Sequence, residues 1–150
     1  MIEVDVSGAG IPRFPRTAIA DYVRLVLRAV GREVPAARHV GSASVLIAGD
    51  EEMKRINRSF RRKNATTDVL TFPADATYIE PGSSRRPLGD LIISIDQARR
   101  QARAEKHSLA TEVRYLLLHG IIHAFGFDHD ADDGEMNQLE MEMRVRLGLE

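Results

Sequence analysis

Cysteine and tryptophan are absent from this chain of 150 residues, and aromatic residues make up only 5% of it. Without cysteine there are no disulfides and no thiolate metal sites, so any bound metal must use histidine, aspartate or glutamate. The scarcity of aromatic rings argues against a nucleic-acid surface that depends mainly on base stacking.

Long apolar runs are missing as well. No apolar segment follows a basic N-terminus, and none approaches the roughly 18 residues that a membrane-spanning helix needs. We therefore expect a cytoplasmic protein that makes no membrane contact. Because 43% of the chain is hydrophobic, residues 1–150 are expected to form a single domain with its own core.

Lysine is scarce too, since only three of the 21 cationic residues are lysines. The net charge of −1 excludes a polycation that coats nucleic acid over its whole surface. The preference for arginine fits phosphate recognition by guanidinium groups, but a coding bias would produce it equally well.

The periodicities predict an α+β domain in which four strands form one mixed sheet and helices pack mainly on one face. Strands are expected at residues 2–6, 44–48, 69–72 and 91–95, the last of them central. Helices are expected from a cap at Thr17 to Gly31, from a cap at Asp50 to about Phe60, from a cap at Asp96 to about Lys106, from Ser108 through the apolar segment 115–125, and over about 132–147. Residues 74–87, with their prolines, glycine and serines, are expected to form a mobile surface loop.

Three of the five histidines fall within eleven residues, at positions 119, 123 and 129. His119 and His123 are four residues apart, so on a helix their rings project from the same face. That helix is apolar all round and belongs in the core. Gly126 can adopt the left-handed conformation that ends a helix and reverses the chain, which would bring His129 toward the other two histidines.

Unpaired imidazoles in a core carry a desolvation cost, which a metal removes by taking their nitrogen lone pairs. We therefore predict that His119, His123 and His129 hold one Zn²⁺ with an open coordination position. Another divalent transition metal would serve, because three imidazoles discriminate little between these ions.

The histidine spacing is that of metzincin-type zinc enzymes, but Gly120 stands where their catalytic glutamate follows the first histidine. Glycine cannot take a proton from a metal-bound water, so the substitution disfavours peptide cleavage. Asp128, beside His129, is the nearest candidate for proton transfer. It fits equally well as an acceptor that orients a ligand imidazole, or as a turn residue.

A run of cations precedes the expected strand at 69–72. Six cations and no anions fall within ten residues, namely Lys54, Arg55, Arg58, Arg61, Arg62 and Lys63. Acids in the first turn of a helix and bases in its last turn complement the helix dipole, which explains part of this pattern. It does not explain why the cations continue beyond the helix, where they could hold phosphates. A phosphodiester substrate suits cations beside a metal, because both stabilise the negative charge of the transition state.

Three segments resemble the bacterial YbeY endoribonuclease family. Residues 119–129, HGIIHAFGFDH, are similar to its signature HGxLHLxGYDH. Residues 60–73, FRRKNATTDVLTFP, resemble its segment YRGKDKPTDVLSFP, and residues 88–94, LGDLIIS, match its strand LGDIxIS. The segments occur in the family's order, and the resemblance covers roughly residues 40–147, with little of it in the first 35 residues. Four positions depart from the pattern: Arg62 replaces a glycine, Ala65 a lysine, Thr66 a proline and Phe127 a tyrosine.

The resemblance implies a metal-dependent, single-strand-directed endoribonuclease that acts in ribosomal RNA maturation, notably at the 3′ end of the small-subunit RNA, and in ribosome quality control. It implies His119, His123 and His129 as zinc ligands, the first two also catalytic, and Arg61 as a catalytic or substrate-contacting residue. Arg62 and Lys63 would add affinity for the RNA. The small ribosomal subunit and its assembly factors would be the partners.

Two other functions are compatible with the same residues. One is a ribosome-assembly factor that binds ribosomal RNA without cutting it and whose zinc is structural, for instance with Asp128 as a fourth ligand. The other is a zinc metallopeptidase, which the histidine spacing favours and Gly120 disfavours.

Overall fold

A mixed sheet forms the centre of the computed structural model, which describes residues 2–61, 68–74, 85–126 and 133–149. Within these residues the strands are β1 (Glu3–Gly8), β2 (Val40–Ala48), β3 (Val69–Pro73) and β4 (Arg86–Ser94), in the order β1-β2-β4-β3. β2 is parallel to β1 and to β4, whereas β3 is antiparallel to β4. The predicted mixed four-stranded sheet is confirmed, and β4 is an inner strand as expected.

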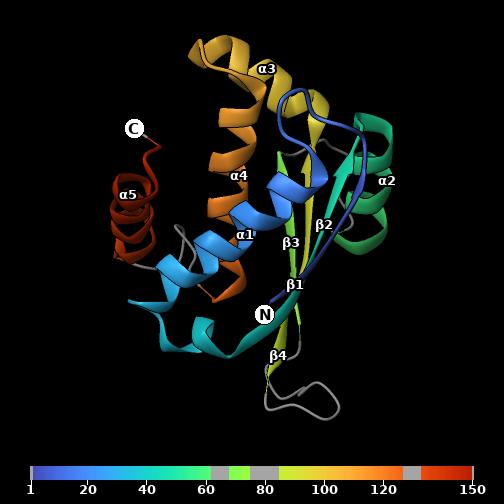
Figure 1. Cartoon of the computed structure of the whole chain (residues 1–150). Helices are drawn as coiled ribbons and strands as arrows, with labels where there is room; N and C mark the ends of the chain where they lie inside the picture. Colours follow the sequence, from blue (N-terminus) through green and yellow to red (C-terminus); the bar gives the residue numbers. More distant parts are fainter. Residues whose placement is uncertain (1, 62–67, 75–84, 127–132, 150) are drawn as a thin grey trace.

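The helices cover the two faces of this sheet unequally. They are α1 (Arg16–Gly31), a 3₁₀ helix η1 (Pro35–His39), α2 (Asp50–Arg61), α3 (Ile95–Glu105), α4 (Leu109–Ala124) and α5 (Glu135–Leu147). On β4, Leu91 and Ile93 are buried in the main core with α1, α4 and α5, whereas Ile92 packs with Met53 of α2. Figure 1 shows α1, α4 and α5 on one side of the sheet and α2 on the other. The predicted α+β arrangement, with helices mainly on one face, is confirmed.

Helix α4 lies in the middle of the main core, as its apolar sequence predicts. Leu117, Ile121 and Ile122 have no solvent exposure. The helix begins after Ser108, whose side chain accepts a hydrogen bond from the backbone N–H of Thr111 at 3.1 Å. This N-cap is the predicted one, and it satisfies one of the donors that a helix start leaves unpaired.

Three other predicted helix starts are wrong. α1 follows Pro15 without a side-chain cap, so Thr17 lies inside the helix. The cap of α3 is Ser94, whose side chain accepts from the N–H of Gln97 at 3.1 Å, and Asp96 is instead in the first turn. Asp50 is the first residue of α2 and not its cap. Each of these starts has a second polar residue or a proline within two residues of the predicted cap.

Strand lengths were underestimated from the sequence. β2 begins at Val40, four residues before the predicted strand, because the chain there pairs with β1 on one side and β4 on the other. β4 begins at Arg86, so the end of the predicted loop 74–87 is strand. Residues 75–84, the rest of that loop, lie outside the described part of the chain.

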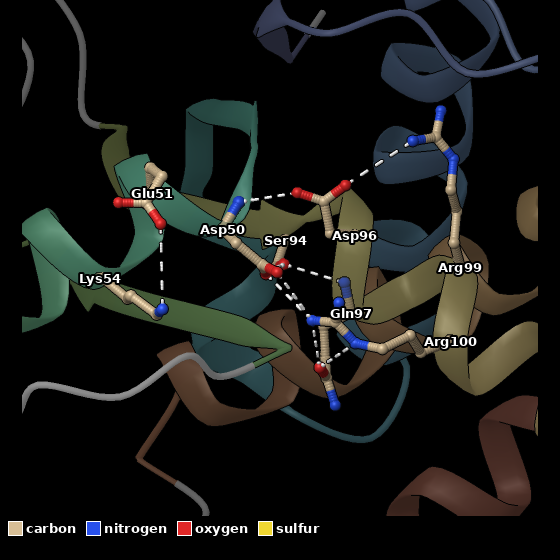
Figure 2. Close-up of polar contacts among 8 residues, drawn as sticks. All are labelled: Asp50, Glu51, Lys54, Ser94, Asp96, Gln97, Arg99 and Arg100. Carbon is tan, nitrogen blue, oxygen red and sulfur yellow. Dashed lines mark hydrogen bonds and ion pairs between the residues drawn. The ribbon is translucent and has the colours of Figure 1, made fainter.

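Polar contacts between the starts of α2 and α3 explain the corrected helix ends (Figure 2). The backbone N–H of Asp50 donates to Asp96 Oδ2 at 2.8 Å, so the carboxylate from α3 caps α2. In return, the Asp50 carboxylate accepts from Ser94 Oγ at 3.4 Å and from Arg100 Nη2, which lies 3.0 Å from both of its oxygens. The two helix starts thereby fix each other, and with them the direction in which α2 runs toward Arg61.

Replacing Ser94 by alanine is expected to lower the free energy of unfolding by about 1–2 kcal/mol, because the buried hydroxyl both caps α3 and bonds to Asp50. Ser108→Ala is the matched comparison, since Ser108 also caps a helix but is exposed. Urea unfolding of both variants measures the difference. A smaller cost for Ser94→Ala than for Ser108→Ala would show that the contact with Asp50 contributes nothing.

Candidate metal centre

His119 and His123 lie one turn apart on α4, as their spacing requires. Their ring centroids are 4.6 Å apart, and the ring planes meet at 69°. Both residues are half-buried, although the neighbouring turns of α4 are in the core. Two imidazoles this close on one helix face can bind the same ion.

A carboxylate from α5 fixes the first of these rings. Oε1 of Glu140 lies 2.5 Å from His119 Nδ1, and the Glu140 side chain is only 7% exposed. An ionised carboxylate only accepts hydrogen bonds, so Nδ1 carries the proton and the lone pair is on Nε2. A metal-binding histidine ordinarily has this arrangement, in which a carboxylate holds one ring nitrogen and the other faces the ion. The donor set therefore fits a divalent transition metal.

The sequence interpretation missed Glu140, although a signal was present. Met136 and Met143 form the buried stripe of α5, and Glu140 lies four residues after the first and three before the second. An acid on a buried helix face calls for a partner, since an unpaired buried charge is costly. Arg144 Nη2 is a second neighbour of this carboxylate, 3.5 Å from Oε2.

Gly120 lies where α4 approaches the sheet most closely. A Cβ at this position would be 3.2 Å from the side chains of both Leu91 and Val69, and 3.4 Å from Thr71 Oγ1. Thr71 also donates to the Gly120 carbonyl at 3.3 Å. The face of α4 at this residue is thus occupied by β3 and β4. Even a Cβ here would require Leu91 and Val69 to shift by a few tenths of an ångström, so the packing disfavours a side chain as long as glutamate at this position.

The end of α4 agrees with the predicted reversal as far as it is described. Gly126 has a φ of +90°, in the region that favours glycine, and its N–H donates to the His123 carbonyl at 2.9 Å. The helix stops at Ala124. Asp128 and His129 lie outside the described residues. Within the described part of the chain, no group of three or more potential ligands is assembled.

The predicted RNA-binding cations are described only in part. Arg61 is the last residue of α2, whereas Arg62 and Lys63 lie outside the described residues. Earlier in the run, Lys54 and Arg55 pair with first-turn acids, at 3.9 Å from Glu51 and 3.8 Å from Glu52. The segment after Arg61 leads into β3, whose Val69 and Thr71 contact α4 at Gly120. The chain therefore runs from the cationic helix end toward the strand that packs on the histidine helix.

A cavity of about 360 Å³ lies at the C-terminal end of α4, where Ala124 lines it. Phe125 and Gly126 line it on the helix side, Pro73 and Leu88 on the sheet side, and Arg86 adds one positive charge. The mixture of apolar surface and a guanidinium group suits a ligand that has both a flat apolar part and an anionic part.

Comparisons with known proteins agree with this architecture. A solution structure of a protein from Thermotoga maritima has the same fold, with a TM-score of 0.56, 21% identity, and coverage of 97% of this chain and 89% of that one. The sequence model of the family described as endoribonuclease YbeY matches residues 11–148.

Curated relatives carry the same name. The endoribonuclease YbeY of Solibacter usitatus is 41% identical over 134 residues, which are 89% of this chain and 80% of the relative. That of Nautilia profundicola is 44% identical over 105 residues, covering 70% of this chain and 71% of the relative. The chain belongs to the YbeY family of endoribonucleases, which are RNA-cleaving hydrolases, and the predicted resemblance is confirmed. Among the described helices, none has the length and apolar character needed to cross a membrane.

Glu140→Gln is expected to weaken metal binding by about 10- to 100-fold, because the neutral amide no longer holds the imidazole N–H of His119 as a carboxylate does. Titration of the metal-free protein with Zn²⁺ or Co²⁺ measures the change. Glu142→Gln is the control, since it removes one charge from an exposed position on the same helix. Equal affinities of the two variants would contradict a role for Glu140 in orienting His119.

Proposed function

We propose that this protein is a metal-dependent endoribonuclease that cuts single-stranded RNA during ribosomal RNA maturation. The observation that carries the proposal is the His119–His123 pair on a core helix, with a buried carboxylate 2.5 Å behind the first ring. Family membership supplies the substrate class. His119, His123 and His129 would hold one Zn²⁺ or a similar ion. Such an ion acts as a Lewis acid and makes a bound water more acidic at neutral pH.

The residues of the chain would act in distinct ways. Glu140 keeps the proton of His119 on Nδ1 and holds the ring against rotation. Arg61, with Arg62 and Lys63, would neutralise the phosphodiester and so lower the energy of the more highly charged transition state. Asp128 remains the candidate for proton transfer. We place the activity in the cytoplasm, with the small-subunit RNA as substrate, its 3′ end as the cleaved region, and assembly factors as partners.

The fold also bears on the alternatives. The tight contacts at Gly120 disfavour a longer side chain beside the first histidine, which argues against a metallopeptidase. A non-cutting assembly factor would bind the same RNA and leave it intact. The test of function therefore has to record binding and cleavage separately.

Arg61→Ala is expected to reduce cleavage of single-stranded RNA by about 100-fold or more, since it removes one charge that contacts the phosphodiester. Its metal content should stay unchanged. Arg103→Ala, which removes an arginine from the last turn of α3, is the matched control. Equal cleavage by the wild type, Arg61→Ala and His123→Ala would reveal a contaminating nuclease and overturn the proposal, while RNA binding without cleavage would favour the assembly factor.

A further inference from the structure

Four arginines surround a second cavity, which lies at the C-terminal end of α1 and measures about 440 Å³. They are Arg28 and Arg32 at the end of α1, Arg38 of η1, and Arg85 immediately before β4. Among the described residues that line this hollow there is no aspartate or glutamate. Four guanidinium groups around one concave surface create a positive potential that attracts an anion.

Local helix electrostatics explains part of this cluster and not the whole. Arg28 lies in the last turn of α1, where cations complement the helix dipole. Arg38 Nε donates to the Gly31 carbonyl at 2.6 Å, which fixes that guanidinium at the rim. Arg85 comes from a different part of the chain, immediately before β4, so the cluster is not the product of one helix end. The acid closest in sequence, Glu33, is paired with Arg146 of α5 at 2.7 Å.

The arginine cavity adjoins the cavity at the C-terminal end of α4. Val40 lines both, and neighbouring residues divide between them, with Ala37 in one and Ala36 in the other. In the same way Arg85 lines the arginine cavity, and Arg86 lines the cavity that reaches Phe125 and Gly126. In Figure 1 the starts of β2 and β4 and the end of α4 lie at the same end of the molecule. The two cavities are thus adjacent, one at the end of the histidine helix and the other at the four arginines.

We propose that Arg28, Arg32, Arg38 and Arg85 form a remote subsite that holds backbone phosphates of the RNA strand lying across the metal centre. This subsite rests on the proposed endoribonuclease function and adds a second contact to the predicted one at residues 61–63. Guanidinium groups bind phosphate bidentately, and an extended strand places successive phosphates where several of them can be engaged. A strand too short to reach the cavity gains nothing from it. The subsite therefore selects long single strands over short ones.

The test is the double substitution Arg28→Gln with Arg32→Gln, which neutralises two exposed positions four residues apart, one in the last turn of α1 and one at its C-cap. Arg99→Gln with Arg103→Gln is the matched control, because these are exposed arginines at the same spacing on α3. Fluorescence anisotropy with a long and a trinucleotide single-stranded RNA, over a series of salt concentrations, measures binding. The single variant Arg85→Gln, outside any helix, tests the subsite independently of the stability of α1.

At about 0.1 M salt the loss of two phosphate contacts is expected to weaken binding of the long RNA by roughly 25-fold, and to reduce the slope of log K against log salt by about 1.4. Arg85→Gln should cost about fivefold on the same basis. The trinucleotide should bind all variants equally, and cleavage of the long RNA should show a raised KM with an unchanged kcat. The Arg99/Arg103 control should bind like the wild type.

Equal weakening in the double variant and its control would overturn the subsite, because it would reduce the effect to net charge. So would an equal loss for long and short RNA, or complete competition by millimolar inorganic phosphate, since either points to a small-anion site. A long-RNA effect in a protein that cuts no RNA would uphold the subsite and refute the proposed function. If the arginine variants bound the long RNA as the wild type does and the protein cut RNA normally, the subsite would be refuted and the proposed function upheld.

Discussion

Replacing His123 by alanine is expected to remove the bound metal and to lower RNA cleavage by at least about a thousandfold. His119 and His123 together present two imidazoles to one ion, with ring centroids 4.6 Å apart, and a single remaining ring on α4 cannot hold it in place. The loss of several kcal/mol of transition-state stabilisation corresponds to this factor. Elemental analysis of untagged protein measures the metal, and a single-stranded RNA assay measures cleavage.

Thermal unfolding tests, independently of activity, whether the His123→Ala substitution removes the metal. A ligand at 100 times its dissociation constant stabilises the native state by about 2.7 kcal/mol. A chelator should therefore lower the Tm of the wild type and leave that of His123→Ala unchanged. His39→Ala, at an exposed histidine, is the control and should keep both the metal and the response. A chelator response retained by His123→Ala would show that this residue is not a ligand.

Much of the fold could be predicted because periodic patterns reflect burial directly. The apolar run that contains Leu117 and Ile121 predicted a core helix, and the apolar strand at 91–95 predicted an inner strand, since both lie where all sides are covered. The histidine pair followed from helix geometry alone. These features depend only on residues close together in the sequence.

Features that depend on distant residues were not predicted. Asp50 and Asp96 were both assigned as caps of their own helices, yet Asp96 caps the helix of Asp50, 46 residues away. Glu140 meets His119 across 21 residues. The buried position of Glu140 indicates locally that this acid needs a partner, but neither pairing can be read from local sequence, because each partner is set by how the helices dock. The arginine cavity has the same character, since its four residues come from three segments that only the fold brings together.

Gly120 illustrates how a local pattern and its tertiary cause combine. The sequence showed that the peptidase glutamate is missing, and the fold shows that β3 and β4 occupy its place. The close approach of α4 to the sheet brings Val69 and Thr71 of β3 against the histidine helix. Gly120 therefore has two effects. It removes the glutamate that peptide hydrolysis requires, and it lets α4 pack closely on β3 and β4.

Gly120→Glu, which restores the peptidase motif, is expected to destabilise the protein by about 3 kcal/mol or more. Its Cβ alone would lie 3.2 Å from Leu91 and Val69, and the carboxylate would be driven into an apolar contact. For a chain of 150 residues, such a loss lowers Tm by roughly 10 °C. No peptidase activity should appear, because a glutamate that separates α4 from the sheet cannot also reach the metal site. Calorimetry and an unstructured-peptide assay measure the two outcomes.

The variant Gly120→Ala separates the steric cost of a Cβ at this position from the cost of burying a carboxylate. Alanine favours a helix by about 1 kcal/mol over glycine, which offsets part of the overpacking of about 1–3 kcal/mol, so its net cost should be small. A Gly120→Glu variant as stable as Gly120→Ala would mean that α4 moves away from β3 and β4 without penalty, and the steric reason for the missing glutamate would be wrong. If that variant also cleaved peptides, the histidine helix would be a peptidase scaffold lacking one side chain. We instead expect Gly120→Glu to be much less stable than Gly120→Ala, because only a small residue at this position allows α4 to pack against the sheet.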